Sequence, residues 1–189
     1  MEYLRAGFVL VGGRSSRMGA DKALLPFHGL TLAGYVAGQV AEAASTVCLV
    51  GDPACYGHLG FPVVADNYPG QGPLAGIEAA LSASRAEWNL VVACDMPGVS
   101  AVLFRQLLDA AVESGADCLI PQGPTARPEP LCAVYRSSCL DAVRDALRRD
   151  VRKVTAALAG LRSASWNYPE SPWFQNVNTP GEWAPYRDG

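Results

Sequence analysis

Apolar, strand-like runs alternate with Ala-rich, helix-like stretches along almost the whole chain, and this alternation limits the fold more than any other feature. The runs predicted to be strands cover residues 6–11, 46–50, 62–65, 90–94, 118–121 and 131–135. The stretches predicted to be helices cover residues 31–45, 74–84, 100–114 and 138–161, with Ser100 as an N-cap and a break near Asp150. Such alternation is typical of a parallel-type sheet with helices on both faces. We therefore expect an open, mostly parallel α/β sheet in a three-layer α/β/α arrangement.

The composition of the chain limits its number of domains and the classes of partner it can bind. A chain of 189 residues, half of them hydrophobic, can build one core, so we predict a single domain over residues 1–189. The net charge of −3 gives no general attraction to nucleic acid or to an anionic membrane. The chain shows no signal-peptide pattern and no run of membrane-spanning length. Six cysteines without a C-x-x-C pair or metal-ligand spacing indicate reduced thiols, and we expect a cytoplasmic protein.

Polar motifs follow three of the predicted strands at the point where each strand ends. Gly12 and Gly13 follow the first strand, Asp66 follows the third and Asp95 follows the fourth. In open α/β sheets, ligands bind beyond the carboxyl ends of the strands. The sequence therefore predicts a ligand site at this edge of the sheet.

The stretch after the first strand, residues 10–22, reads L-V-G-G-R-S-S-R-M-G-A-D-K. A Gly-Gly pair lets a ligand approach the backbone N–H groups closely, and Arg14, Arg17 and Lys22 place three cations beside them. Such a group suits a polyphosphate. The spacing matches neither a Walker A loop nor a dinucleotide-binding G-x-G-x-x-G. The alternative is an ordinary strand-to-helix turn with solvated arginines.

Two carboxylates stand next to this loop in the predicted sheet. Asp95, between an apolar strand and Met-Pro, suits a Mg²⁺ ligand, and the alternative is a helix cap. Asp66 precedes a Gly/Pro-rich loop, where an Asx turn is an equally good interpretation. Residues 72–76 (G-P-L-A-G) form a rigid turn into a helix, and their glycines leave room for a flat ring against the backbone.

Five motifs together resemble the molybdenum cofactor guanylyltransferases, a family of nucleotidyltransferases. They are the loop G-G-R-S-S-R-M-G-A-D-K, C-D-M-P at residues 94–97, G-P-L-A-G at 72–76, P-L-C-A-V-Y at 130–135 and N-V-N-T-P at 176–180. The motifs occur in the expected order and span nearly the whole chain. The resemblance implies the Rossmann-like nucleotidyltransferase fold. The implied reaction transfers GMP from GTP to the phosphate of molybdopterin or the molybdenum cofactor, with release of pyrophosphate.

The resemblance also implies roles for individual residues. Arg17, Lys22 and Asp95 would be catalytic, and Asp95 would hold Mg²⁺. The nucleotide would be bound by residues of the first loop, the Asp66 loop and the metal site: Leu10, Val11, Gly12, Gly13, Lys22, Asp66, Gly72, Pro73, Leu74 and Asp95. Candidates for the pterin side are Arg152, Lys153, Asn176 and Asn178. Further candidate partners are other cofactor-biosynthesis proteins and an acceptor molybdoenzyme.

Some positions depart from the family pattern. Val11 stands where Ala is usual, Lys153 stands where an Arg is expected, and Gln71 lies in the loop expected to read guanine. A cytidylyltransferase or a sugar-phosphate nucleotidyltransferase of the same fold therefore remains an alternative, as does a non-catalytic nucleotide or cofactor binder. His28 and His58 lie in polar or Gly-flanked settings and are expected at the surface rather than in catalysis.

Overall fold

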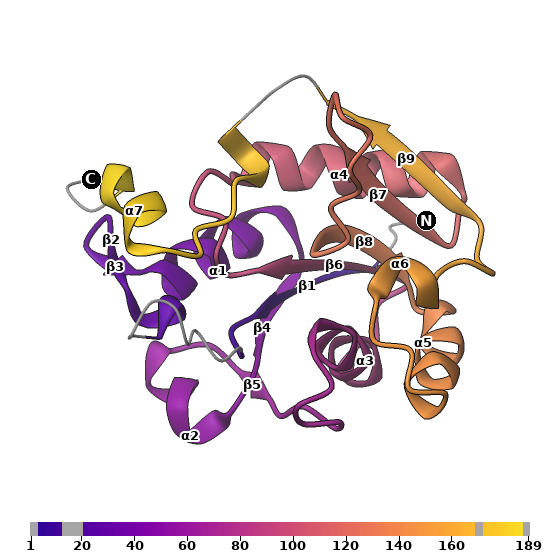
Figure 1. The fold of residues 1–189 in the computed structure, drawn as a ribbon, viewed down its shortest axis with the longest axis horizontal. Coiled ribbons are helices and arrows are strands. Elements are labelled where there is room, and N and C mark those ends of the chain that lie inside the picture. Colours follow the sequence, from indigo (N-terminus) through magenta and orange to yellow (C-terminus); the bar gives the residue numbers. More distant parts are fainter. Residues whose placement is uncertain (1–3, 13–20, 169–171, 187–189) are drawn as a thin grey trace.

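A central, mixed sheet organises the computed structural model, which describes residues 4–12, 21–168 and 172–186. Within these ranges the sheet has seven strands (Figure 1), ordered β5 (Val63–Val64), β4 (Thr46–Val50), β1 (Arg5–Leu10), β6 (Trp88–Ala93), β8 (Cys132–Arg136), β7 (Cys118–Gln122) and β9 (Ser163–Asn167). β1 pairs in parallel with β4 and β6, while β8 runs antiparallel to both of its neighbours. The expected open, mostly parallel sheet is confirmed.

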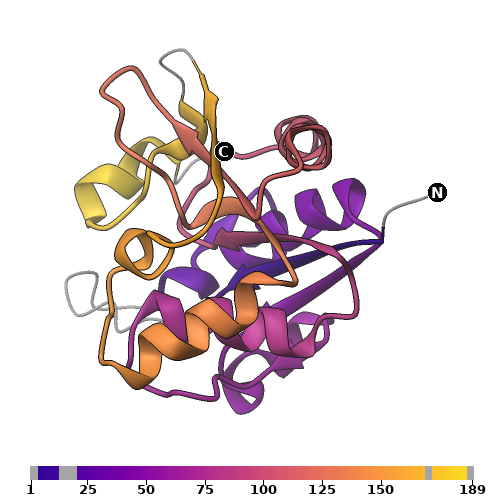
Figure 2. The same ribbon diagram turned by 90° about the vertical axis from the view of Figure 1, so that its right-hand side faces the viewer.

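Helices cover both faces of the sheet and form the three predicted layers (Figure 2). α1 (Leu32–Ala43) and α4 (Ala101–Ser114) pack together on one face. α3 (Pro73–Ala83) and α5 (Cys139–Arg148) pack together on the other. Each face has its own apolar core. Of the described helices, none is long and apolar enough to cross a membrane.

The sequence of β1 shows how the two cores are divided. Ala6, Phe8 and Leu10 belong to the core under α3 and α5, whereas Val9 belongs to the core under α1 and α4, as the two-residue period of a strand requires. Gly7 lies against α1, where an added Cβ would come within 2.0 Å of Cγ1 of Val40. The absence of a side chain at this position lets α1 lie close to the central strand.

Short polar side chains begin the helices where the sequence predicted. The Thr31 hydroxyl accepts a hydrogen bond from the backbone N–H of Gly34 at 3.1 Å, so α1 starts at Leu32. The Ser100 hydroxyl accepts one from the N–H of Leu103 at 3.3 Å and begins α4, which confirms the predicted N-cap. Each cap satisfies one of the N–H groups that a helix start leaves without a partner.

For residues 138–161, the predicted break near Asp150 is confirmed, but the helix predicted after the break is much shorter than expected. α5 ends at Arg148, Asp150 takes a positive φ of 58° that interrupts the helical backbone, and the short α6 (Val154–Ala157) follows. The edge strand β9 was not predicted, because its sequence S-A-S-W-N has little apolar character and is half exposed. Other unpredicted elements are similarly short: η1 (Lys22–Leu24), β2 (Pro26–Phe27), β3 (Leu30–Thr31), α2 (Pro53–Tyr56), η2 (Gly57–Leu59), η3 (Pro172–Phe174), α7 (Pro180–Trp183) and η4 (Ala184–Tyr186).

A buried charge links α3, α5 and the loop that follows Asp66. The carboxylate of Glu78 on α3 is almost inaccessible to solvent and accepts hydrogen bonds from Arg144 (2.8 Å), Ser82 (2.6 Å) and Asn67 (2.9 Å). Burial alone would raise the pKa of Glu78, but these three hydrogen bonds and the charge of Arg144 outweigh it and hold the pKa below the ordinary value of 4.5. The network therefore ties the Asp66 loop to the helix that follows it.

We predict that Arg144→Met lowers the free energy of unfolding at pH 7 by roughly 2–3 kcal/mol, because it leaves a buried carboxylate without its cation. Arg144 is partly exposed, which keeps the effect below that of a fully buried pair. Since the folded pKa of Glu78 is depressed, the stabilisation is present above pH 4.5 and is lost as the pH falls through the folded value. Urea unfolding should therefore be measured at pH 7 and at a pH below the folded pKa of Glu78. The difference in unfolding free energy between the variant and the parent should be smaller at the lower pH.

Arg148→Met is the matched control, one turn further along α5. The Arg148–Asp145 pair is exposed on both sides, so its loss should change stability by less than about 0.5 kcal/mol. Equal losses in the two variants would contradict the assigned role of the Glu78 network.

Candidate active site

The carboxyl ends of β1, β4, β5 and β6 meet at one edge of the sheet. Leu10 at the end of β1 is in register with Val50 of β4 and with Ala93 of β6. Beyond these pairs the backbone stays joined, because the N–H of Val11 donates to Val50 and the N–H of Cys94 donates to Leu10. The loops that carry the predicted motifs therefore start side by side, as the parallel pairing requires.

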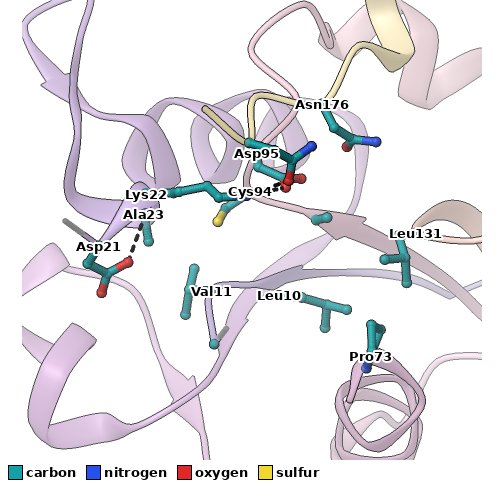
Figure 3. Close-up of a pocket in the computed structure, with 13 residues that line it drawn as sticks. Leu10, Val11, Asp21, Lys22, Ala23, Pro73, Cys94, Asp95, Leu131 and Asn176 are labelled. Carbon is teal, nitrogen blue, oxygen red and sulfur yellow. Dashed lines mark hydrogen bonds and ion pairs between the residues drawn. The ribbon is translucent and has the colours of Figure 1, made fainter. Parts of the chain in front are cut away.

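The first cavity at this edge, which we call the Asp95 cavity, has a volume of about 310 Å³. Figure 3 shows the Lys22 side chain extending along it to Asp95, with Leu10 and Val11 beneath. Its walls come from the first loop, the end of β6, the start of α3 and the C-terminal segment: Leu10, Val11, Gly12, Asp21, Lys22, Ala23, Pro73, Ala93, Cys94, Asp95, Leu131, Asn176 and Asn178. The structure thus brings together residues that lie far apart in the sequence.

Lys22 contacts two other residues that line the Asp95 cavity. Its ammonium group lies 3.1 Å from Oδ2 of Asp95 and donates a hydrogen bond of 2.7 Å to Oδ1 of Asn178. The side chains of Lys22 and Asp95 are 16% and 21% exposed, so the ion pair is partly shielded from water yet reachable from the cavity. An anionic ligand could therefore take the place of either oxygen on the ammonium group.

The C-terminal segment is fixed in this position by backbone hydrogen bonds. The N–H of Val177 donates to the backbone carbonyl of Asp95 at 2.9 Å. Glu182 accepts from the N–H groups of Asn178 (2.7 Å) and Thr179 (3.0 Å), and Thr179 caps α7 in return. The hydrogen bond from the N–H of Asn178 lowers the pKa of Glu182, burial opposes this, and the hydrogen bonds from Thr179 lower the pKa further. A capping box thus sets the position of the two asparagines.

Asp21 also lines the Asp95 cavity, although the sequence analysis gave it no role. One of its carboxylate oxygens accepts from the N–H of Ala23 at 3.0 Å and begins η1, and the other accepts from the hydroxyl of Tyr56 at 2.7 Å. Burial, with Asp21 beside it, raises the pKa of Tyr56 well above its ordinary value, so the phenol stays protonated and donates. Asp21 therefore orients Lys22 through the backbone of η1. In the sequence, the indication of this role is that Asp21 directly precedes Lys22.

A second cavity, the Asp66 cavity, adjoins the first and has a volume of about 870 Å³. Leu10, Gly12 and Pro73 line both cavities, so the two are continuous. Asp66 accepts a hydrogen bond of 2.8 Å from the N–H of Tyr68, which is the Asx turn that one interpretation of the sequence expected. This bond uses only Oδ1, and Asp66 still lines the cavity.

The start of α3 forms the wall between the two cavities. Gly72 has a φ of 77°, which favours glycine, and Pro73 occupies the first turn of α3, where its missing N–H costs nothing. The side chain of Leu74 is fully buried in the core and lines neither cavity, so a contact with a nucleotide would have to come from its backbone.

Val11, which stands where the family usually has Ala, is accommodated by a glycine on the neighbouring strand end. Its side chain is 2% exposed and packs over Gly51, where an added Cβ would lie only 2.8 Å from a methyl group of Val11. Gly51 therefore provides the space that the larger side chain needs. Gly13 and Arg17, both predicted to contact phosphates, lie outside the described residues.

The four candidates for the pterin side do not gather in one place. Asn176 and Asn178 line the Asp95 cavity. Arg152 instead pairs with Asp150 and donates to the backbone carbonyl of Gly70 at 3.3 Å, on the rim of the Asp66 cavity, and Lys153 is exposed at the start of α6. The basic pair and the asparagines therefore approach the site from different sides.

The carboxylate oxygens of Asp95 suit a hard divalent cation whose remaining coordination positions are filled by a ligand. Among the described residues no group of three or more His, Cys, Asp or Glu side chains gathers as a metal cage. A single cavity-facing carboxylate is what Mg²⁺ commonly uses when phosphate oxygens and waters fill the rest of its shell. Asp95 fits this pattern, provided that Lys22 moves from Oδ2 to the ligand.

Thiols and imidazoles are poorly placed for catalysis here. Cys94 lines the cavity, but burial raises its pKa far above neutrality, with a further contribution from Asp95, so it stays a neutral thiol. His28 and His58 are exposed, as expected, and neither lines the Asp95 or Asp66 cavity. All six cysteines are free.

Several solved structures share the fold of this chain. The molybdopterin-guanine dinucleotide biosynthesis protein A of Archaeoglobus fulgidus is similar over 97% of each chain, with a TM-score of 0.82 and 28% identity. A cytidylyltransferase from Thermus thermophilus (TM-score 0.72, 18% identity, 96% of each chain) shares the fold alone. So does a Mycobacterium tuberculosis protein solved in complex with manganese (TM-score 0.72, 16% identity, 100% of each chain).

Proteins related in sequence identify the family more narrowly than the solved structures do. The chain is 33% identical to the probable molybdenum cofactor guanylyltransferase of Carboxydothermus hydrogenoformans, covering 93% of this chain and 91% of the relative. It is 32% identical to the molybdenum cofactor guanylyltransferase of Serratia proteamaculans, covering 92% and 89%. The family model for the MobA-like NTP transferase domain matches residues 7–164. The chain belongs to the family of MobA-like nucleotidyltransferases.

Proposed function

We propose that this chain transfers GMP from GTP to the phosphate of molybdopterin or the molybdenum cofactor, with release of pyrophosphate and formation of the guanine dinucleotide. The names of its full-length relatives support this function. The observation that carries it is the contact of Lys22 with both Asp95 and Asn178, because it joins three of the predicted motifs in one cavity. A non-catalytic binder would need no such cluster at the phosphate position.

The two continuous cavities divide the nucleotide between them. The larger Asp66 cavity would hold the guanosine, with the backbone of Gly72 and Pro73 against the base. The smaller Asp95 cavity would hold the phosphates, because its polar side chains include the Lys22 ammonium group. Gly12, which lines both cavities, would lie along the path between sugar and phosphates, and Gly13 and Arg17 of the same loop would extend the phosphate site.

The proposed reaction requires the protein mainly to position the two substrates and to neutralise negative charge on the phosphates. A phosphate monoester has a second pKa of about 6, so the attacking phosphate is already mostly ionised at neutral pH and requires no general base. Lys22 would bind oxygens of the triphosphate and stabilise the charge that develops on the leaving pyrophosphate. Mg²⁺ held by Asp95 would supply further charge neutralisation on the phosphate oxygens. Asn176 and Asn178 would orient the incoming acceptor from the opposite wall of the cavity.

The remaining assignments are also part of this proposal. Arg152 and Lys153 would add positive charge near the cavity rim, where Arg152 already contacts Gly70. The partners would be GTP and molybdopterin or the molybdenum cofactor, followed by an acceptor molybdoenzyme or another protein of cofactor biosynthesis. Free thiols at all six cysteines suit a cytoplasmic location.

Asp95→Asn tests the metal assignment. The change keeps the shape of the side chain but removes the charge that would hold Mg²⁺, so turnover of GTP should fall by about 100-fold or more while the protein stays folded. Steady-state turnover over a range of Mg²⁺ concentrations measures the effect. The exposed Asp141→Asn should retain the parent activity. Near-parent turnover of Asp95→Asn at saturating Mg²⁺ would rule the assignment out.

The choice of base can be tested without the acceptor. If the Asp66 cavity reads guanine, GTP with Mg²⁺ should raise the melting temperature clearly more than CTP or ATP at equal concentration, because only a bound ligand stabilises the folded state. Thermal melts with the three nucleotides make the comparison. A shift with CTP equal to or greater than that with GTP would instead favour the cytidylyltransferase alternative.

Lys22→Ala separates transition-state stabilisation from ground-state binding. Charge grows on the pyrophosphate as it leaves, so kcat should fall by about 100-fold or more while the Kd for GTP rises by only a few-fold. Steady-state kinetics beside calorimetric GTP titrations measures both quantities, with the exposed Arg85→Ala as a control that should change neither. Parent-like turnover in Lys22→Ala would show that this lysine does not stabilise the transition state.

A further inference from the structure

A third cavity, which we call the Glu129 cavity, lies next to the Asp95 cavity and has a volume of about 610 Å³. Asn176 and Asn178 line both, so the two cavities are continuous. None of the described residues lines both the Glu129 and the Asp66 cavity. The Asp95 cavity, where the phosphates would react, therefore lies between two outer spaces. One of these would hold the nucleotide, which leaves the Glu129 cavity for a second substrate.

Glu129 is held firmly in the loop between β7 and β8. Its backbone N–H donates to Pro121 at 2.9 Å and its carbonyl accepts from Cys132 at 3.1 Å, while Pro128 forms a bridge to Gln122. The backbone of Glu129 is therefore fixed on both sides at the wall of the cavity that the residue lines.

The carboxylate of Glu129 is shielded from water but weakly partnered. Its side chain is 13% exposed, and its ion pair with Arg127 spans 3.9 Å to a guanidinium group that is 77% exposed. Burial raises the pKa of Glu129, and Arg127 opposes this only in part. A shielded carboxylate is stabilised by hydrogen-bond donors, and a ligand in the cavity could supply them.

The other carboxylate of this cavity is already occupied. Glu182 accepts the backbone N–H groups of Asn178 and Thr179 as part of the capping box of α7. Among the described residues lining the cavity, Glu129 is thus the carboxylate that is not committed to the backbone. Apolar surface next to it comes from Phe174, Val177 and Tyr186, two of which are aromatic. A flat heterocycle with hydrogen-bond donors on one edge matches this lining.

We propose that Glu129 determines specificity for the acceptor, by accepting two hydrogen bonds from the 2-amino-4-oxopyrimidine edge of a pterin bound in the Glu129 cavity. This inference rests on the proposed function for the presence of a pterin substrate. The ring N3–H and the 2-amino group of a pterin lie side by side, so they match the two oxygens of a carboxylate. The phosphate of the same molecule would extend past Asn176 and Asn178 toward Lys22.

Charge sets the direction in which such an acceptor enters. The Glu129 cavity is lined by two carboxylates, Glu129 and Glu182, and by one largely exposed cation, Arg127, so its lining is net negative. A phosphate is attracted instead to the partly shielded ammonium group of Lys22 in the Asp95 cavity. The acceptor is therefore bound with its pterin edge at Glu129 and its phosphate in the Asp95 cavity, which is the orientation needed for transfer. Guanine carries the same pair of donors, so the test must show which substrate depends on Glu129.

Glu129→Gln removes one acceptor oxygen and places an NH₂ group opposite the donors of the pterin. At saturating GTP, the KM for molybdopterin should rise by about 10-fold or more, while kcat and the KM for GTP stay within about 2-fold of the parent. Glu113→Gln, a change of the same kind on the exposed surface of α4, should leave all three constants unchanged. Thermal melts of both variants check that they are folded.

A binding measurement tests the same contact without turnover. The fluorescent probe 6-hydroxymethylpterin monophosphate should bind the parent about 10-fold more tightly than its lumazine analogue, which carries an oxygen in place of the 2-amino group. Glu129→Gln should lose most of this discrimination. An unchanged KM for the acceptor together with unchanged discrimination would overturn the inference. A rise in the KM for GTP alone would assign Glu129 to guanine and would overturn it as well.

These outcomes are separable from the proposed function. If the parent protein forms no guanine dinucleotide from GTP and molybdopterin, the proposed function fails, while Glu129-dependent pterin binding would still support the inference. If the parent forms the product and Glu129→Gln behaves like the parent in both assays, only the inference fails.

Discussion

Parallel pairing of β1 with β4 and β6 is the constraint on which the rest of the site depends. It places the ends of three strands in register at Leu10, Val50 and Ala93, so that the loops leaving them start next to one another. Gly7 lets α1 lie close to β1, and the Glu78 network joins α3 to α5 and to the Asp66 loop. Packing on both faces thus fixes the positions of the strands, while the candidate catalytic side chains lie on the loops beyond them.

Within that frame, the electrostatics of the cavity depend on one cation with two oxygen partners. Lys22 contacts Asp95 and Asn178, which pairs the charges of Lys22 and Asp95 in a partly shielded space. A polyphosphate with its cation offers replacements for both contacts, since phosphate oxygens suit the ammonium group and a divalent ion suits the carboxylate. The same three side chains therefore stabilise one another and are suited to bind a polyphosphate with its cation.

The arrangement of the three cavities suits a reaction between two substrates. The Asp66 and Glu129 cavities each open into the Asp95 cavity but share no described lining residue. Two substrates bound in the outer cavities would meet only where the phosphates react, and positioning of this kind accounts for much of the catalysis of phosphoryl-group transfer. A cytidylyltransferase shares the fold at 18% identity, so the fold by itself does not determine which base or acceptor is bound.

The sequence by itself determined the layers of the fold, the polar strand ends and the family. Apolar periodicity and helix caps such as Ser100 are local properties, and motifs such as the Asp95 strand end carry their chemistry within a few residues. Only the tertiary structure decided that Lys22 contacts Asn178, 156 residues away, and that Arg152 lies against Gly70 instead of beside the asparagines. It also revealed the weakly apolar edge strand β9, the role of Asp21 and the shielding of Glu129. These features depend on contacts between distant segments, and no local pattern of residues encodes which segments will meet.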